Sequence, residues 1–161
     1  MSAPRRLWAP WRNAYHVKGK GRGCIFCVAA RLPARRQREH HVLARGKGVF
    51  AMLNLYPYNN GHFMVAPARH VGRLDALRSA EWLEMLRVSQ RIMARITKHL
   101  RPDGFNVGLN LGRVSGAGFP GHLHLHVVPR WNGDTNFMPV VGHAKVISQS
   151  LDAVHMLLKD R

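Results

Sequence analysis

Histidines occupy every second position of residues 122–128, as His122, His124 and His126, with aliphatic residues between them. Successive side chains of a strand point to opposite faces, so this alternation predicts a strand with a histidine face and a core face. Neighbouring histidines would lie roughly 6.5 Å apart along the backbone, too far for all three to contact one atom easily. We therefore expect one histidine to act on a substrate while its neighbours orient it, donate protons or bind metal. The alternatives are a polar face that meets water and three metal ligands.

Four shorter apolar runs predict further strands. Residues 46–48 form a turn between the first two runs, and residues 59–61 precede the third. These connections are too short for parallel crossovers, so the strands should pair antiparallel. The four runs cover residues 42–45, 49–54, 62–67 and 105–111, and residues 137–141 are a less regular candidate.

Apolar residues recur at intervals of three and four between Ser79 and Leu100, which predicts an amphipathic helix. Ser79 is the expected cap, and Pro102 and Gly104 should end the helix. A second helix is expected over residues 148–159. The helix at residues 79–100 should face the core with Trp82, Met85, Leu86, Ser89, Met93, Ile96 and Leu100. The pattern predicts an α+β fold, with helices packed on one face of an antiparallel sheet.

The length of 161 residues fits one domain. We take residues 1–161 as one domain with a basic, aromatic N-terminal arm (1–23) and a C-terminal extension (137–161). Trp8 and Trp11 of the arm should pack on the domain or on a second subunit, or stack on a base. The chain has no run of 18 apolar residues and no apolar signal segment after its first charges. We therefore expect a soluble, cytoplasmic protein that does not associate with membranes.

Positive charge is concentrated in the N-terminal third. The net charge is +17, and residues 1–50 hold 12 Lys or Arg against a single acid, Glu39. Such a segment suits an anionic partner. Nucleotide phosphates, nucleic acid and a merely solvated surface all fit this charge.

The two cysteines, Cys24 and Cys27, are too few for a disulfide framework. A redox motif, a metal clip and no special role remain. The redox motif should follow a strand, but residues 16–23 form a basic, glycine-rich stretch, which argues against it.

Residues 122–128 fit the pattern His-φ-His-φ-His-φ-φ, in which φ is apolar. With this pattern the chain resembles the histidine-triad superfamily of nucleotide hydrolases and transferases over roughly residues 7–150. The resemblance implies about five strands and usually a homodimer. It is carried further by residues 24–27, 53–62 and 104–110, and residues 129–137 are similar to the branch that acts on diadenosine tetraphosphate.

The resemblance implies a role for each histidine. A neutral imidazole is a competent nucleophile near pH 7, and attack on phosphorus gives a labile phosphoramidate. The family pattern assigns this attack to His124, with a nucleotidyl-His124 intermediate on the α-phosphate. His126 would orient or bind phosphate, with His62 close by and His122 completing the catalytic set.

The same resemblance suggests nucleotide-binding residues. Asn110 and the backbone amides of Gly118 and Phe119 are candidate donors to the transferred group, and Asn54 is a candidate for ribose or base contact. The glycine-rich loop 112–121 suits close approach to an anion, although it is not a Walker motif. Many family members carry Gln or Ser at the position of Gly118, so backbone or water must replace that contact.

Cys24 and Cys27 need two further ligands for tetrahedral zinc. The resemblance to zinc-containing members supplies His70 and His122, although His70 alone also fits a surface or helix-start residue. Structural zinc is therefore expected, and no organic cofactor.

We expect an enzyme that cleaves dinucleoside polyphosphates, with an adenine nucleotide as substrate, by hydrolysis or phosphorolysis. One alternative is hydrolysis of nucleoside phosphoramidates or adenylate conjugates. Another is a zinc-containing protein that binds nucleic acid through the basic N-terminal half, which the absence of a reading motif disfavours. A nucleotide-binding sensor with little turnover is the third.

Overall fold

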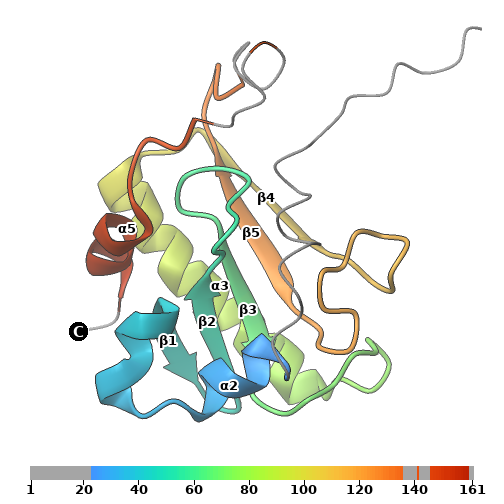
Figure 1. The fold of residues 1–161 in the computed structure, drawn as a ribbon. Helices are drawn as coiled ribbons and strands as arrows, with labels where there is room; N and C mark the ends of the chain where they lie inside the picture. The colour runs from blue at the N-terminus through green and yellow to red at the C-terminus, as the bar shows by residue number, and fades with distance from the viewer. Residues whose placement is uncertain (1–22, 136–140, 142–145, 160–161) are drawn as a thin grey trace, which may run out of the picture.

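A single five-stranded antiparallel sheet organises the chain (Figure 1). The computed structural model describes residues 23–135, 141 and 146–159. The strand order β1-β2-β3-β5-β4 confirms the predicted α+β fold class. In that order the strands are β1 (Val42–Gly46), β2 (Val49–Leu53), β3 (Phe63–Pro67), β5 (Leu125–Arg130) and β4 (Gly104–Leu109).

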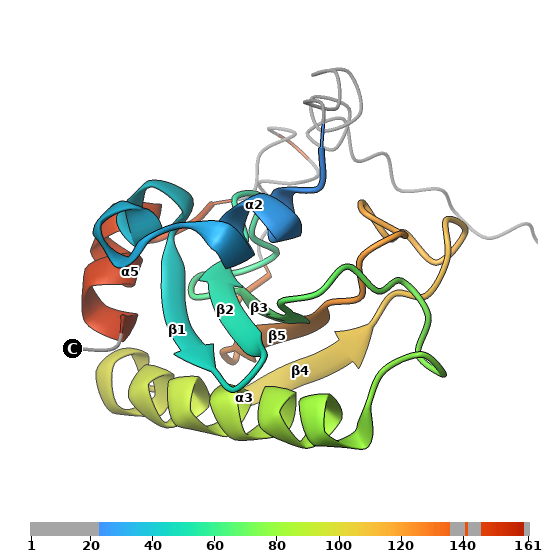
Figure 2. The same cartoon turned by 90° about the horizontal axis from the view of Figure 1, so that it is seen from below.

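One face of the sheet packs on the long helix α3 (Ser79–Leu100), and α5 (Leu151–Leu158) lies beside β1 and α3 (Figure 2). The core side of α3 differs in part from the predicted stripe. Leu86 is 37% exposed, whereas Val88 and Ile92 are buried. The other six predicted positions are buried or packed against the core, so the stripe holds except at Leu86, and Val88 and Ile92 add to it.

The start of α3 also differs from the prediction. The N-cap is Arg78, and Ser79 is the first helical residue. The carboxylate of Glu81 accepts a hydrogen bond from the Arg78 amide at 2.9 Å and also binds the Arg69 guanidinium at 2.7 Å. Glu81, at the third helical position, therefore satisfies the amide of the N-cap residue, while Ser79 does not cap the helix.

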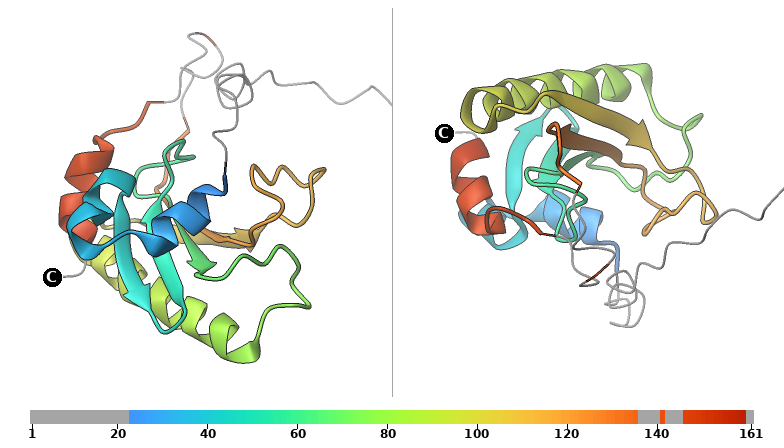
Figure 3. Two further views of the ribbon diagram at one scale, coloured as in Figure 1. Left: turned by 60° about the horizontal axis from the view of Figure 1, so that its bottom comes forward. Right: turned by 90° about the horizontal axis from the view of Figure 1, so that it is seen from above.

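The opposite face carries the short helix α2 (Ile25–Arg31), so that α2 and α3 lie on opposite sides of the sheet (Figure 3). Phe26 and Ala29 are buried there against β2 and β3 side chains that include Phe50 and Met64. Arg45 fixes the end of α2 by donating to three backbone carbonyls at 2.7 to 3.0 Å. The 3-10 helix η2 (Ala34–His40) follows α2. Helices therefore cover both faces of the sheet, whereas the sequence predicted helices on one face only.

The histidine segment begins before its strand. Strand β5 starts at Leu125, so His122 and His124 lie in the approach to it rather than within it. The approach is held by Leu123, whose amide donates to the Val71 carbonyl at 2.7 Å. The predicted alternation persists, because the aliphatic residues between the histidines are buried in the α3 core.

Parts of the expected N- and C-terminal organisation lie outside the described residues. These are the arm up to residue 22, with its two tryptophans, and the candidate strand 137–141 apart from residue 141. Among the helices that the structure describes, none combines the length and apolar character that a membrane span needs.

Candidate active site and metal-binding cluster

His124 lies in a row of aromatic rings that runs from α2 to the sheet. Its ring stacks on Phe26 at 4.6 Å between centroids, and the ring of His126 lies 4.8 Å away. Its Nδ1 lies 2.7 Å from the carbonyl oxygen of His122, which can only accept a hydrogen bond. The proton of a neutral His124 is therefore on Nδ1, and the lone pair of Nε2 is left for chemistry.

His62 and His126 form a hydrogen-bonded pair with a defined direction. The backbone amide of Tyr58 donates to Nδ1 of His62 at 3.0 Å, so the His62 proton is on Nε2. That Nε2 lies 3.0 Å from Nδ1 of His126 and donates to it. His126 therefore carries its own proton on Nε2. The pair presents an N–H donor beside the free lone pair of His124.

Burial keeps these imidazoles neutral. Burial, followed by the neighbouring His126 and His124, lowers the pKa of His62 to about 3. Burial and the neighbouring His124 lower the pKa of His126 to about 4. Burial also lowers the pKa of His124, against the opposing effect of its bond to the His122 carbonyl. Near pH 7 all three imidazoles are therefore neutral bases.

A pocket of about 430 Å³ adjoins these histidines on the β4–β5 side of the sheet. We call it the β4–β5 pocket. Polar and aromatic side chains form much of its wall, and His126 connects it to the histidine row. Its lining includes Tyr58, Asn106, Asn110, His126, Arg130 and Asp134.

Asp134 fixes one wall of the β4–β5 pocket. Its carboxylate accepts hydrogen bonds from Arg130 at 2.6 and 2.8 Å and from Asn59 at 2.8 Å. The hydrogen bonds from Arg130, followed by that from the Trp131 amide, hold the pKa of Asp134 well below its usual range. A third Arg130 nitrogen, Nη1, donates to Oδ1 of Asn106 at 2.8 Å. The wall is therefore rigid and charge-compensated.

The nucleotide-binding candidates occupy different places. Asn110 lines the β4–β5 pocket. Asn54 lies at the other side of the pair, with its Nδ2 3.3 Å from Nδ1 of His62. Phe119 packs edge-on against Phe26 with ring centroids 5.9 Å apart, and Gly118 precedes it, half-buried. All four surround the histidine row, and their roles remain predictions.

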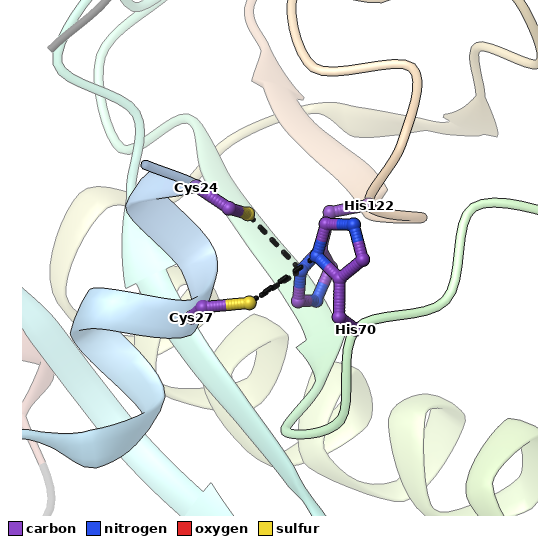
Figure 4. A group of neighbouring side chains, drawn as sticks. All are labelled: Cys24, Cys27, His70 and His122. Carbon is purple, nitrogen blue, oxygen red and sulfur yellow. Dashed lines mark hydrogen bonds between the residues drawn. The ribbon is translucent and has the colours of Figure 1, made fainter. Parts of the chain in front are cut away.

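Cys24, Cys27, His70 and His122 converge on one point, although they come from three parts of the chain (Figure 4). Their ligand atoms all lie within 4.8 Å of one another. Nδ1 of His122 is 3.2 Å from the Cys24 sulfur and 3.6 Å from that of Cys27, and Nδ1 of His70 is 3.2 Å from Cys27. Tetrahedral zinc, with bonds near 2.3 Å to sulfur and 2.0 Å to nitrogen, would place sulfur and nitrogen about 3.5 Å apart.

The surroundings of His122 fit a metal ligand. Its Nε2 lies 2.9 Å from the carbonyl oxygen of Pro67, so its proton is on Nε2 and its Nδ1 lone pair faces the cysteines. Gly72 brings the loop of His70 close, because a Cβ at that position would meet the Gly121 backbone at 2.9 Å. Burial raises the pKa of the Cys27 thiol, and a bound cation would favour its thiolate form.

Phe26 and Tyr58 were not singled out in the sequence, yet they enclose the histidines. Tyr58 stacks on His62 with ring centroids 4.9 Å apart, while Phe26 stacks on His124. Both lie within segments that carry the family resemblance. Nothing in their spacing distinguishes an aromatic that packs on a histidine from one that fills a core.

A sheet that presents a neutral, directed imidazole beside an N–H donor defines a protein suited to nucleophilic attack on a phosphorus or acyl centre. Comparisons with known proteins identify the family. The model of the HIT domain family matches residues 35–133. The chain belongs to this family, the histidine-triad proteins.

Two relatives and one solved structure illustrate the similarity. A Mycobacterium tuberculosis protein named AP-4-A phosphorylase is 43% identical over 160 residues, 96% of this chain and 82% of its own length. A Dictyostelium discoideum protein named bis(5'-adenosyl)-triphosphatase is 33% identical over 81 residues, 50% of this chain and 54% of its own. The crystal structure of a zinc-bound histidine triad family protein from Mycobacterium smegmatis has a TM-score of 0.67 and 25% identity, covering 85% of this chain and 91% of that one.

Proposed function

We propose that the protein is a nucleotidyltransferase or hydrolase that cleaves dinucleoside polyphosphates of the diadenosine tetraphosphate type through a nucleotidyl-His124 intermediate. The observation that carries the proposal is the 2.7 Å contact between Nδ1 of His124 and the His122 carbonyl, because it leaves Nε2 as a free nucleophile. The similarity to the relative named AP-4-A phosphorylase supports the choice of substrate.

In the first step the Nε2 lone pair of His124 forms a bond to the α-phosphorus, and the bond from phosphorus to the departing polyphosphate oxygen breaks. The departing oxygen takes the electron pair and accepts a hydrogen bond from Nε2–H of His126. The imidazole of His124 gains positive charge, which the His122 carbonyl at 2.7 Å from Nδ1 stabilises.

In the second step an acceptor oxygen attacks the same phosphorus, and the phosphorus–nitrogen bond breaks. The electron pair returns to Nε2 of His124, which restores the neutral base. Water as the acceptor yields AMP and releases a proton, whereas inorganic phosphate yields ADP. The acceptor enters from the side that the first leaving group vacates, because each displacement is in line.

The direct test is to follow the products from diadenosine tetraphosphate, with and without inorganic phosphate. His124→Ala should lower turnover at least ~100-fold, because no intermediate can form. ADP with ATP identifies phosphorolysis, and AMP with ATP identifies hydrolysis. His99→Ala is the matched control, since His99 is exposed at the end of α3.

Two results would contradict the proposal. Cleavage into two ADP in the absence of phosphate would exclude attack at the α-phosphorus. Turnover that survives His124→Ala would exclude the covalent intermediate.

We further propose that the four-residue cluster of Cys24, Cys27, His70 and His122 holds structural zinc. The metal would fasten α2 to the histidine segment, because the cysteines belong to α2 and its cap. Elemental analysis should find one zinc per chain, and Cys27→Ser should lower both the zinc content and the melting temperature. The same zinc content in Cys27→Ser as in the unaltered protein would refute this site. Cysteines used as ligands also support the proposed cytoplasmic location, where thiols stay reduced.

We also propose a homodimer that pairs through β4. This strand lies at the edge of the sheet, and Val107 on it is 50% exposed. Edge strands offer unpaired backbone groups to a second chain. Light scattering should show a dimer that Val107→Lys weakens and Val114→Lys, in an exposed loop, does not. A monomer at micromolar concentration would contradict the proposal.

A further inference from the structure

The β4–β5 pocket is open to a ligand beside the reaction centre, and the chemistry described above uses only its His126 wall. Its volume of about 430 Å³ is typical of small-molecule sites. We propose that this pocket receives the departing half of a dinucleoside polyphosphate, the nucleoside polyphosphate that His124 displaces, and that Asn106 recognises its phosphates. The inference rests on the proposed function.

The hydrogen bond proposed from His126 to the departing oxygen leads the leaving group to this pocket. In-line displacement puts the departing oxygen opposite the attacking nitrogen. His124 lies between Phe26 of α2 and His126, with ring centroids 4.6 and 4.8 Å away. A departing oxygen that accepts a hydrogen bond from His126 is therefore at the mouth of the β4–β5 pocket, which His126 lines.

Asn106 gives the pocket a donor of defined orientation. Its Oδ1 accepts a hydrogen bond from Nη1 of Arg130 at 2.8 Å, so the two N–H groups of its Nδ2 lie on the other side of the amide. Within the part of the chain that the structure describes, these N–H groups have no hydrogen-bond acceptor. Polyphosphate oxygens are acceptors only, which matches this side of Asn106.

The pair of Arg130 and Asp134 in the pocket wall explains why an amide, rather than a net positive charge, would select the ligand. Asp134 binds Arg130 through two hydrogen bonds, at 2.6 and 2.8 Å, and so matches its charge. The same bonds hold Arg130 in place and thereby fix the Asn106 amide. A donor fixed before binding loses little conformational entropy when the phosphate arrives.

Asn106→Asp tests this role with little structural change. An Asp keeps an oxygen acceptor for Arg130, but it loses the N–H donors and adds a negative charge. We compare kcat/KM for diadenosine tetraphosphate with that for adenosine 5′-phosphoramidate, which shares the adenylyl half but releases only ammonia. The variant should lower the first value about tenfold or more and leave the second within about twofold.

Asn132→Asp is the matched control, because Asn132 is exposed and does not line the pocket. It should change neither substrate's kcat/KM by more than about twofold. An equal loss on both substrates in Asn106→Asp, or no loss on either, would overturn the inference. If the unaltered protein turns over the phosphoramidate but not the dinucleotide, the proposed function itself fails, and this is seen before any variant is compared.

Discussion

Lowering the pH from 7.5 to 5.0 should reduce the free energy of unfolding by about 4 kcal/mol, because His62 and His126 are held in the fold as neutral bases. In the unfolded chain both have a pKa near 6.5. In the folded protein burial, ahead of neighbouring imidazoles, lowers these pKa values to about 3 and about 4. Below pH 6.5 the unfolded chain therefore binds protons that the folded chain does not, and stability falls as the pH falls.

The magnitude follows from the size of the interval. Each pH unit between the two pKa values of a group changes the free energy of unfolding by about 1.4 kcal/mol. At pH 5.0 the interval below 6.5 is about 1.5 units, which gives about 2 kcal/mol for each histidine. The sum is a large part of the 5–15 kcal/mol by which domains are stable. Above pH 6.5 both groups are neutral in both states and contribute nothing.

Urea unfolding at several pH values between 5.0 and 7.5, followed by tryptophan fluorescence, measures this loss. His62→Asn should lose only about half as much stability on acidification, since one of the two titrating groups is gone. His99→Asn should lose as much as the unaltered protein, because His99 is exposed. The zinc concentration of the buffer is kept constant, so that the proposed metal site affects all three proteins alike.

The comparison between variants decides the outcome. An acid loss in His62→Asn equal to that of the unaltered protein would show that His62 does not contribute as a buried neutral base. A total loss of less than about 1 kcal/mol in the unaltered protein would refute the reasoning for both histidines.

Three substitutions test the packing around the site. Trp131→Phe should destabilise the fold by about 1 kcal/mol in urea unfolding, since the indole N–H donates to the last carbonyls of α3, including that of Leu100, at 3.1 Å. Gly61→Ala should cost about 1–3 kcal/mol by the same assay, because Gly61 has a φ of +72° and a Cβ there would lie 3.2 Å from a Leu100 methyl. Phe26→Ala should cost about 3–5 kcal/mol and also lower turnover, because Phe26 is buried and stacks on His124. Unchanged midpoints in any of these variants would contradict the corresponding contact.

Periodicity along the chain predicted most of the fold. The hairpin of β1 and β2 could be predicted from two short apolar runs on either side of the turn at residues 46–48. The histidine alternation could be predicted because strand side chains alternate with a period of two. Errors arose where a contact distant in sequence decides the local structure. Strand β5, which was predicted to contain all three histidines, starts only at Leu125, where pairing with β3 and β4 begins. No pattern within residues 122–128 encodes this pairing.

The candidate site, like the fold, could be predicted from the sequence only in part. Residue types and the family resemblance suggested the four-residue cluster, and the structure brings its members together. The direction of the hydrogen bonds could not be predicted, because it depends on backbone atoms that every residue possesses. The Tyr58 amide sets the tautomer of His62, and the His122 carbonyl sets that of His124. Only folded coordinates show which backbone groups face the rings.

His122 joins the two halves of the site, because two of its groups serve different neighbours. Its ring places Nδ1 at the cysteines, 3.2 Å from Cys24, while its backbone carbonyl accepts the Nδ1 proton of His124 at 2.7 Å. Any ligand that fixes the ring of His122 therefore also fixes the carbonyl that bonds Nδ1 of His124. In the proposed mechanism the cluster influences the reaction without touching the substrate, because it holds His124 in the tautomer with a free Nε2.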